Sequence, residues 1–116
     1  MVVETLEQQR ADLIFHALSD VTRRDIVRRA MEGGQSVSAL ARHYPMSFAA
    51  VQKHVAVLER AELVDKRRQG REQLVQSNID TIRHAFRLLD QLEAIWRSRI
   101  DRFGEVLAEQ NEGATK

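Results

Sequence analysis

The sequence predicts a mainly helical domain that carries one small β-hairpin. The chain of 116 residues is rich in Arg, Glu, Leu and Ala and contains a single proline, which is typical of a helical protein. Five segments place apolar residues three and four positions apart, and capping residues or glycines separate most of them. Around Gly70 this period gives way to two short extended runs, which indicate the hairpin.

Two helices are predicted in the first third of the chain. The first covers about residues 4 to 18, and its apolar stripe consists of Leu6, Leu13, Ile14, Ala17 and Leu18. The second covers about residues 21 to 31, and either Ser19 or Asp20 can cap its start. The glycines after Glu32 are expected to end it by supplying a left-handed residue.

Two more helices, one short and one longer, are predicted in the middle. The short helix follows Ser36 and covers about residues 37 to 43, because the residue before Pro45 avoids the helical region. Ser47 caps the longer helix, which extends to about Ala61. On a helical wheel, its inward residues are Val51, Val55, Leu58 and Phe48, its outward residues are Ala49, Lys53, Ala56 and Arg60, and Ala50 and Gln52 flank them.

A hairpin over about residues 63 to 77, with Gln69-Gly70 between its strands, is predicted next. Its tip is basic, with Lys66, Arg67, Arg68 and Arg71. The last helix opens at Asn78 or Asp80 and runs to about Glu109, a length of about 45 Å. A single domain over residues 1–110 is expected, followed by a disordered tail over residues 111–116.

The last helix carries a broad apolar stripe that suits packing against another helix. A helix this long overhangs a small helical body, and exposed apolar patches usually mark interfaces. We therefore expect a two-fold homodimer formed by the first and last helices. Its expected contact residues are Leu6, Leu13, Leu89, Leu92, Trp96, Ile100, Phe103 and Leu107. The alternative is that the stripe only covers the first helix of the same chain.

The order helix, turn, helix and basic hairpin is that of a winged helix-turn-helix, whose second helix enters the major groove of DNA. The outward alanines would let that helix lie deep in the groove. Gln52 could bond to adenine, and Lys53 to guanine or phosphate. Ser47 and the free amides after it suit a phosphate oxygen, and the cations of the hairpin suit phosphate or a minor groove. The alternative is an ordinary solvated face.

Three stretches of the sequence resemble the ArsR/SmtB-type winged helix-turn-helix repressors. They are ALSDVTRRDIVRRA, SVSALARHYPMSFAAVQKHVAVLERAELV and DKRRQGREQLVQ, and together they fall within about residues 13 to 78. The resemblance implies a dimeric repressor on a two-fold operator. By analogy, the residues that would contact DNA are Ser47, Ala49, Ala50, Gln52, Lys53 and His54, with Arg68 and Arg71 in the wing; Arg60 and Arg67 are expected to join them. For His54, a structural hydrogen bond is an equal alternative.

Three features set the chain apart from that family's pattern. The chain has no cysteine, so the thiolate metal site of some members is absent, and the long tryptophan-bearing last helix is similar to a metal-independent branch. Asp80 and His84 could supply half of a zinc site, but its other half would fall near Ala94 to Arg97, so we expect no metal. Glu62 stands where the family has glycine; either it is strained in a left-handed conformation or the helix runs on by one residue.

Other function classes find little support in the sequence. No catalytic triad, paired carboxylates or glycine-rich phosphate loop stands out, so we expect no enzyme and no cofactor, and no small-molecule effector is indicated. The formal net charge of +1 does not by itself argue for nucleic acid, so the placement of the charges has to decide. The chain is expected in the cytoplasm. The remaining alternative is a winged helix that docks proteins and does not bind specific DNA.

Overall fold

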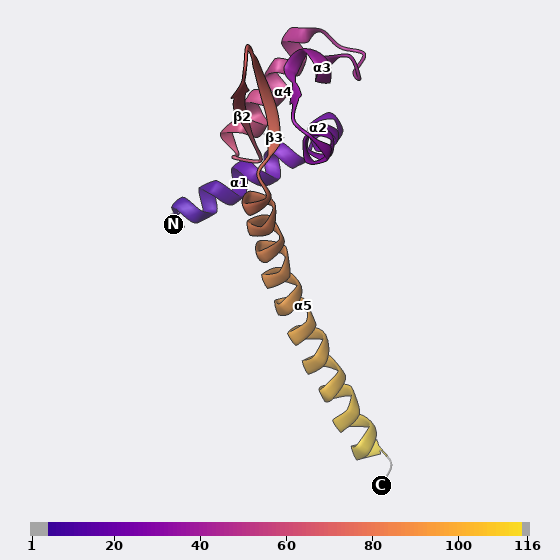
Figure 1. Ribbon diagram of the computed structural model, residues 1–116. Coiled ribbons are helices and arrows are strands. Elements are labelled where there is room, and N and C mark those ends of the chain that lie inside the picture. The colour runs from indigo at the N-terminus through magenta and orange to yellow at the C-terminus, as the bar shows by residue number, and fades with distance from the viewer. Residues whose placement is uncertain (1–4, 115–116) are drawn as a thin grey trace. The chain divides into compact units, whose positions relative to one another are not determined.

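The computed structural model of the chain describes residues 5–114, with side chains described as far as residue 111. The chain folds as two compact units, Met1–Ala85 and Phe86–Lys116. Figure 1 shows the elements in chain order: α1 (Leu6–Leu18), α2 (Val21–Glu32), β1 (Gln35–Ser36), α3 (Val37–Ala41), α4 (Phe48–Arg60), β2 (Val64–Gln69), β3 (Glu72–Ser77) and α5 (Ile79–Ala114). The predicted mainly helical fold with a winged helix-turn-helix is confirmed.

Polar side chains define where the helices begin. The Thr5 hydroxyl accepts from the Gln8 amide at 3.1 Å while the Gln8 side chain accepts from the Thr5 amide at 2.8 Å, a complete capping box. Asp20 caps α2, and Ser36 and Ser47 cap α3 and α4 as predicted. The start of α1 expected at Glu4 lies outside the described residues.

The core takes side chains from each helix of the first unit and from the sheet. Its fully buried members include Ile14, Ile26, Leu40, Val51, Val55, Leu58, Leu63 and Val75. Each such side chain contributes roughly 1.5–3 kcal/mol to the free energy of unfolding through burial. The predicted inward stripe of α4 is therefore right for three residues and wrong for Phe48. The Phe48 side chain is 46% exposed, because it starts the helix beyond the reach of the core.

The sheet has three strands in the order β1-β3-β2, all antiparallel, where only the two-stranded hairpin was expected. Strand β1 pairs Gln35 with Val75. Gly34 precedes it because a Cβ there would lie only 3.1 Å from the Gln76 side chain. Gln69 pairs with Glu72, so the two-residue turn is Gly70-Arg71, one position later than predicted. Gly70 has φ +63°, which suits the first position of a hairpin turn.

Three helix ends differ from the expectations. Gly33 ends α2 at φ 157° and ψ 147°, a positive-φ conformation that residues with side chains rarely adopt, but one outside the left-handed helical region. Helix α3 stops at Ala41, two residues early, with Arg42 as its C-cap. Helix α5 has 36 residues and continues to Ala114, five residues past the predicted end, so residues 111–114 of the expected tail are helical; the last two residues lie outside the described range. None of the described helices is long and apolar enough to cross a membrane.

Candidate nucleic-acid interface

Helix α4 presents a face of small and hydrogen-bonding side chains to solvent. The Ser47 hydroxyl accepts from the Ala50 amide at 3.1 Å, which leaves the amides of Phe48 and Ala49 without acceptors inside the helix. Val51, Val55 and Leu58 are fully buried and fix the opposite face. The exposed residues of α4 include Ala49, Gln52, Lys53, Ala56 and Arg60, whereas Ala50 and His54 are half-buried beside them.

The turn before α4 is tied to α2 by a carboxylate that accepts three hydrogen bonds. Asp25 of α2 accepts from the Tyr44 hydroxyl at 2.6 Å, from Arg28 Nη2 at 2.8 Å and from Arg29 Nε at 2.8 Å. The hydrogen bond from Tyr44, followed by those from the two arginines, holds the pKa of Asp25 well below its usual range. Burial, with the Asp25 hydrogen bond, raises the pKa of Tyr44 to about 12. The cluster fixes the start of α4 against α2.

A second polar contact ties α2 to the end of α1. Arg23 Nε donates to the Ala17 carbonyl at 2.7 Å, and its Nη2 donates to the His16 carbonyl at 3.1 Å. Asp20 accepts from the Arg23 amide at 3.0 Å, and this hydrogen bond is the main reason why the pKa of Asp20 is lowered. Neither the Asp25 cluster nor Arg23 was among the predicted site residues. The sequence held one signal for Arg23: this cation lies three positions before Ile26 and four before Val27, so it shares a helix face with residues that are buried.

The end of α4 shows which of the two expected conformations Glu62 adopts. The helix does not run on: Glu62 adopts φ +61°, a left-handed conformation. Its amide donates to the Glu59 carbonyl and the Leu63 amide donates to the Leu58 carbonyl, both at 3.0 Å, which is a full Schellman motif. Leu58 and Leu63 are buried together. The Glu62 carboxylate lies 3.8 Å from Arg10 of α1.

The wing carries exposed arginines on both sides of its turn. Arg67, Arg68 and Arg71 are exposed, and Arg68 Nε donates weakly to the Gly70 carbonyl at 3.4 Å. Lys66, nearer the base, lies 3.9 Å from Glu59 of α4. Among the described residues, no ion pair within 4 Å engages the three wing arginines, Lys53 or Arg60.

Most of the residues that were predicted to contact DNA lie at one end of the first unit. Figure 1 shows the hairpin tip and the turn before α4 at the same end of this unit, on the side away from α1. Arg60 is different, because it lies about 18 Å along the helix from Phe48. It borders a hollow of about 220 Å³ that is also lined by Leu6, Arg10 and Leu13 of α1.

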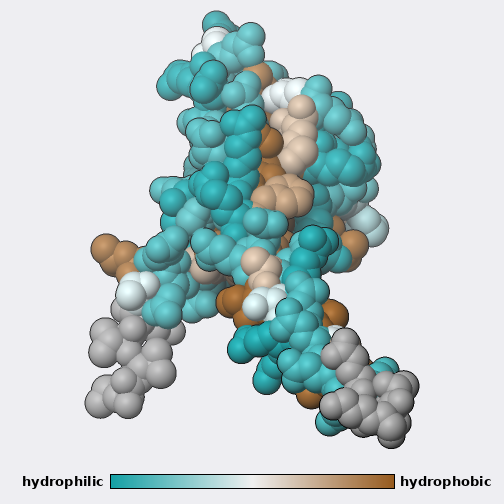
Figure 2. Space-filling model, turned by 90° about the horizontal axis from the view of Figure 1, so that it is seen from below, coloured by the Kyte–Doolittle hydropathy of each residue, from teal (hydrophilic) through white to brown (hydrophobic). Residues whose placement is uncertain are grey.

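The predicted dimer residues are all exposed. In the first unit the side chains of Leu6 and Leu13 are 85% and 40% exposed. In the second unit the predicted residues, about half or more exposed, are Leu89, Leu92, Trp96, Ile100, Phe103 and Leu107. Figure 2 shows the surface from below, where hydrophobic patches interrupt a mostly hydrophilic covering.

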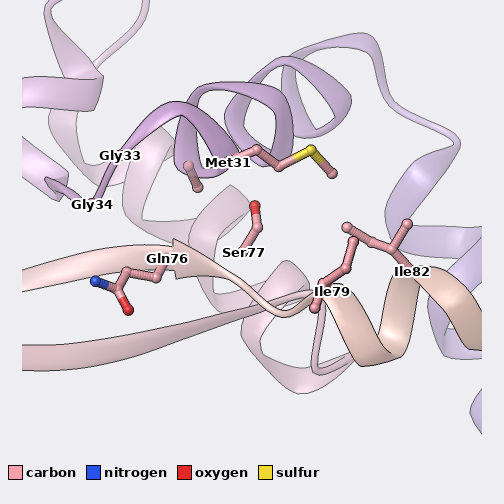
Figure 3. Close-up of a pocket in the computed structure, with 8 residues that line it drawn as sticks. Met31, Gly33, Gly34, Gln76, Ser77, Ile79 and Ile82 are labelled. Carbon is pink, nitrogen blue, oxygen red and sulfur yellow. The ribbon is translucent and has the colours of Figure 1, made fainter.

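A further hollow of about 450 Å³ lies beside the start of α5. Its walls come from the end of α2, the Gly33-Gly34 link, the end of β3 and the first turn of α5. In Figure 3, Ser77 points up toward α2, with Met31 above it and Ile79 and Ile82 to its right. The Ser77 hydroxyl donates to the Val27 carbonyl at 2.7 Å, so this hydrogen bond holds the end of the sheet to α2.

Asp80 and His84, the pair whose spacing could supply half of a zinc site, differ in their exposure. The Asp80 side chain is 86% exposed and lies 3.8 Å from Arg83, whereas His84 Nε2 is a buried atom that has no hydrogen-bond partner among the described residues. Across the described residues, no group of three or more His, Asp or Glu side chains is arranged to hold a metal ion.

Together, these helices and this three-stranded sheet define a winged helix-turn-helix. The chain is similar to an ArsR-like transcriptional regulator from Rhodococcus sp. RHA1, with 30% identity and a TM-score of 0.77 over 84% of this chain and 92% of that one. It is also similar, at 22% identity and a TM-score of 0.61, to a homodimeric winged helix-turn-helix DNA-binding domain from Mycobacterium bovis; the match covers 81% of this chain and 90% of that one. The chain belongs to the ArsR-like family of transcriptional regulators.

Curated relatives agree with this assignment. The HTH-type transcriptional regulator Rv2034 of Mycobacterium tuberculosis is 43% identical over 65 residues, which are 56% of this chain and 61% of that protein. The transcriptional repressor SdpR of Bacillus subtilis is 32% identical over 57 residues, 49% of this chain and 63% of that protein. The alignments thus span a little over three fifths of these relatives. No protein-family model matches the chain.

Proposed function

We propose that this chain is a sequence-specific DNA-binding repressor that acts as a homodimer on a two-fold symmetric operator. The observation that carries the proposal is the pairing, at one end of the first unit, of an exposed helix start with an arginine-tipped wing. A helix start supplies amides and small side chains to a groove, and exposed cations supply contacts to phosphate. The names of the curated relatives support the assignment to transcriptional regulation.

The contacts would divide between specificity and positioning. Ala49, Gln52 and Lys53 would face base edges, because they are exposed in the first half of α4. Ser47, Ala50 and His54, with Arg67, Arg68 and Arg71 of the wing, would contact the backbone. Arg60 belongs to this proposal only as a peripheral phosphate contact, since it lies beside α1 at the far end of the helix.

Dimerisation is supported by the apolar face of the second unit. Trp96, Arg99, Ile100 and Phe103 border a hollow of about 370 Å³. Residues at positions i, i+3, i+4 and i+7 of one helix form the hole that receives a knob from a partner helix. The occupant that fits is the same face of a second copy, because a two-fold pair presents the same apolar residues on both sides. One structural relative is itself described as homodimeric.

Footprinting on the DNA upstream of the chain's own gene would define the site, its symmetry and its half-site spacing. Equilibrium binding to that site and to single-base variants then tests the division of contacts. Gln52→Ala and Lys53→Ala should each lose roughly 1–3 kcal/mol of discrimination at one base pair. Arg68→Ala should weaken all sequences alike and lower the salt slope by about 1.

The control for charge is Arg83→Ala, which removes an exposed arginine that lies near Asp80 at the start of α5. It should leave both affinity and salt slope close to those of the wild type. If Gln52→Ala and Arg68→Ala gave the same profile across the panel of sites, the proposed division of contacts would be wrong.

The second candidate, a protein-docking winged helix, predicts larger apolar anchors on α4. Phe48 is the only large apolar side chain exposed on that helix within the described residues, which favours DNA. Binding to DNA should weaken steeply as salt is raised, whereas docking on an apolar surface should not.

The proposal includes two further expectations. A regulator that binds the chromosome would act in the cytoplasm, and it would not need to catalyse a reaction.

A further inference from the structure

The half-buried imidazole of His54 on α4 faces a guanidinium that the end of α1 already holds in place. Arg23 Nη1 lies 3.3 Å from His54 Nδ1. The other two nitrogens of Arg23, Nε and Nη2, donate to the carbonyls of Ala17 and His16. The orientation of the guanidinium is therefore fixed independently of the histidine.

The chemistry of arginine decides which ring nitrogen carries the proton. A guanidinium has only donors, so its contact with Nδ1 is a hydrogen bond only where Nδ1 offers a lone pair. In a neutral imidazole the proton is then on Nε2. The competing group is the Asp20 carboxylate, which would favour a proton on Nδ1. Its nearest oxygen is 3.9 Å from Nδ1, beyond hydrogen-bond distance, and that oxygen accepts from the Arg23 amide at 3.0 Å.

We propose that Arg23 is a positioning residue that holds His54 in the Nε2–H tautomer, so that Nε2 acts as an uncharged donor to a DNA phosphate. This inference rests on the proposed function. Within the described residues, His54 Nε2 makes no hydrogen bond to the protein. Two side-chain polar atoms of these residues are both buried and without a hydrogen-bond partner, and His54 Nε2 is neither of them, so it is not buried. The side chain is 22% exposed and follows the exposed Lys53. The structural hydrogen bond and the phosphate contact are therefore made by different nitrogens of one ring.

The first test needs no variant and no DNA. Long-range proton–nitrogen NMR of the free protein at about pH 8, above the ordinary range of histidine, should give His54 the nitrogen shifts of a single Nε2–H tautomer. Shifts of the Nδ1–H tautomer or of an imidazolium would overturn the proposal. Because this measurement is made on the free protein, it tests the tautomer of His54 even if the chain does not bind DNA.

The second test compares two amide substitutions at His54 in equilibrium binding to the footprinted site. His54→Asn keeps an acceptor near Nδ1 for Arg23 but has no atom at Nε2. It should weaken binding to all sequences by roughly ten- to a hundredfold, the effect of one hydrogen bond to a charged group. His54→Gln can place an amide donor near Nε2 and should retain more of the affinity. An affinity of His54→Asn equal to the wild type, or a larger loss for His54→Gln, would refute the outward donor.

The salt dependence distinguishes this contact from those of the wing. A neutral donor releases no counterion, so His54→Asn should leave the salt slope unchanged, whereas Arg68→Ala should lower it by about 1. A lower slope for His54→Asn would mean that His54 binds as a cation and would overturn the proposed tautomer. Absence of DNA binding by the wild type would instead refute the proposed function.

A double variant tests whether Arg23 acts through His54. Arg23→Met keeps the aliphatic stem of the side chain and removes its donors. If Arg23 works by orienting the histidine, Arg23→Met with His54→Asn should bind no more weakly than the weaker single variant. Additive losses, with the variants shown by circular dichroism to be folded, would mean that Arg23 contributes independently of His54.

Discussion

Replacing Tyr44 by phenylalanine tests how the turn before α4 is held. The substitution removes only the hydroxyl, which donates to Asp25 at 2.6 Å, and leaves the ring in place. A hydrogen bond to a charged group contributes about 1.5–3 kcal/mol when buried. The Asp25 side chain is 29% exposed and keeps its bonds to Arg28 and Arg29, so we expect a loss of about 1–2 kcal/mol in the free energy of unfolding at pH 7.

The effect has a defined pH window. The pKa of Asp25 is depressed in the folded chain, so the unfolded chain binds a proton more readily than the folded one as acid is added. The stability that Asp25 contributes is fully present above the ordinary aspartate value of about 4 and is lost as the pH falls toward the native pKa. The loss of stability as the pH falls below about 4 should therefore be shallower in Asp25→Asn than in the wild type.

Urea unfolding followed by circular dichroism would measure both effects in Tyr44→Phe, Asp25→Asn and the double variant. A double-mutant cycle at pH 7 should give a coupling of about 1–2 kcal/mol between the two residues. Additivity within about 0.3 kcal/mol would show that the bond does not stabilise the fold and would refute the anchoring role of Tyr44. If the anchor positions α4 for DNA, Tyr44→Phe should also weaken operator binding without a change in base preference.

Three further predictions concern other parts of the chain. Tyr44 is the sole tyrosine, so tyrosinate absorbance should rise with a midpoint near 12 in the folded protein and near the ordinary value of about 10 after unfolding. Because the neutral phenol is the favoured folded form, its contribution to stability is present below about pH 10 and is lost as the pH rises toward 12; a native midpoint near 10 would contradict this. Glu62→Gly should raise the free energy of unfolding by about 0.5–1 kcal/mol, because glycine tolerates φ +61° without strain. Urea unfolding would measure this change, and a lower free energy of unfolding would mean that the contact with Arg10 outweighs the strain. Trp96→Glu with Phe103→Glu should sediment as a monomer while Ser98→Glu, on the other side of α5, stays dimeric, and an unchanged dimer for the double variant would relocate the interface.

Local features of the sequence were enough to predict the helices and the hairpin. Ser36 and Ser47 cap helices as predicted, and Asp20 is the cap out of the two predicted candidates Ser19 and Asp20, because a cap involves residues only three positions apart. The buried stripe of α4 follows from the helical period alone. Strand β1 was missed because it has two residues and exists only through pairing with β3, about 40 positions later. The turn was misplaced by one residue because its position depends on the register of the two strands.

The polar contacts around α4 were beyond the reach of pattern reasoning. Tyr44 and Asp25 are 19 residues apart, and Arg23 and His54 are 31 apart, so neither pair has a sequence spacing that announces it. The sequence could only raise the question of why a cation lies at Arg23, on the inward side of α2. The outward face of α4 was easier to predict, because it is the complement of the buried stripe.

These contacts give α2 an indirect role in the proposed binding of DNA, because they position α4. Tyr44 joins α2 to the turn before α4, and His54 joins it to the middle of α4. The buried stripe of α4 holds the inward face of the helix through hydrophobic contacts, which have no direction of their own. Directional hydrogen bonds to Asp25 and from Arg23 add two fixed points, one in the turn before α4 and one in the middle of the helix. Substitutions in α2 should therefore change the affinity for DNA even though α2 itself would touch none.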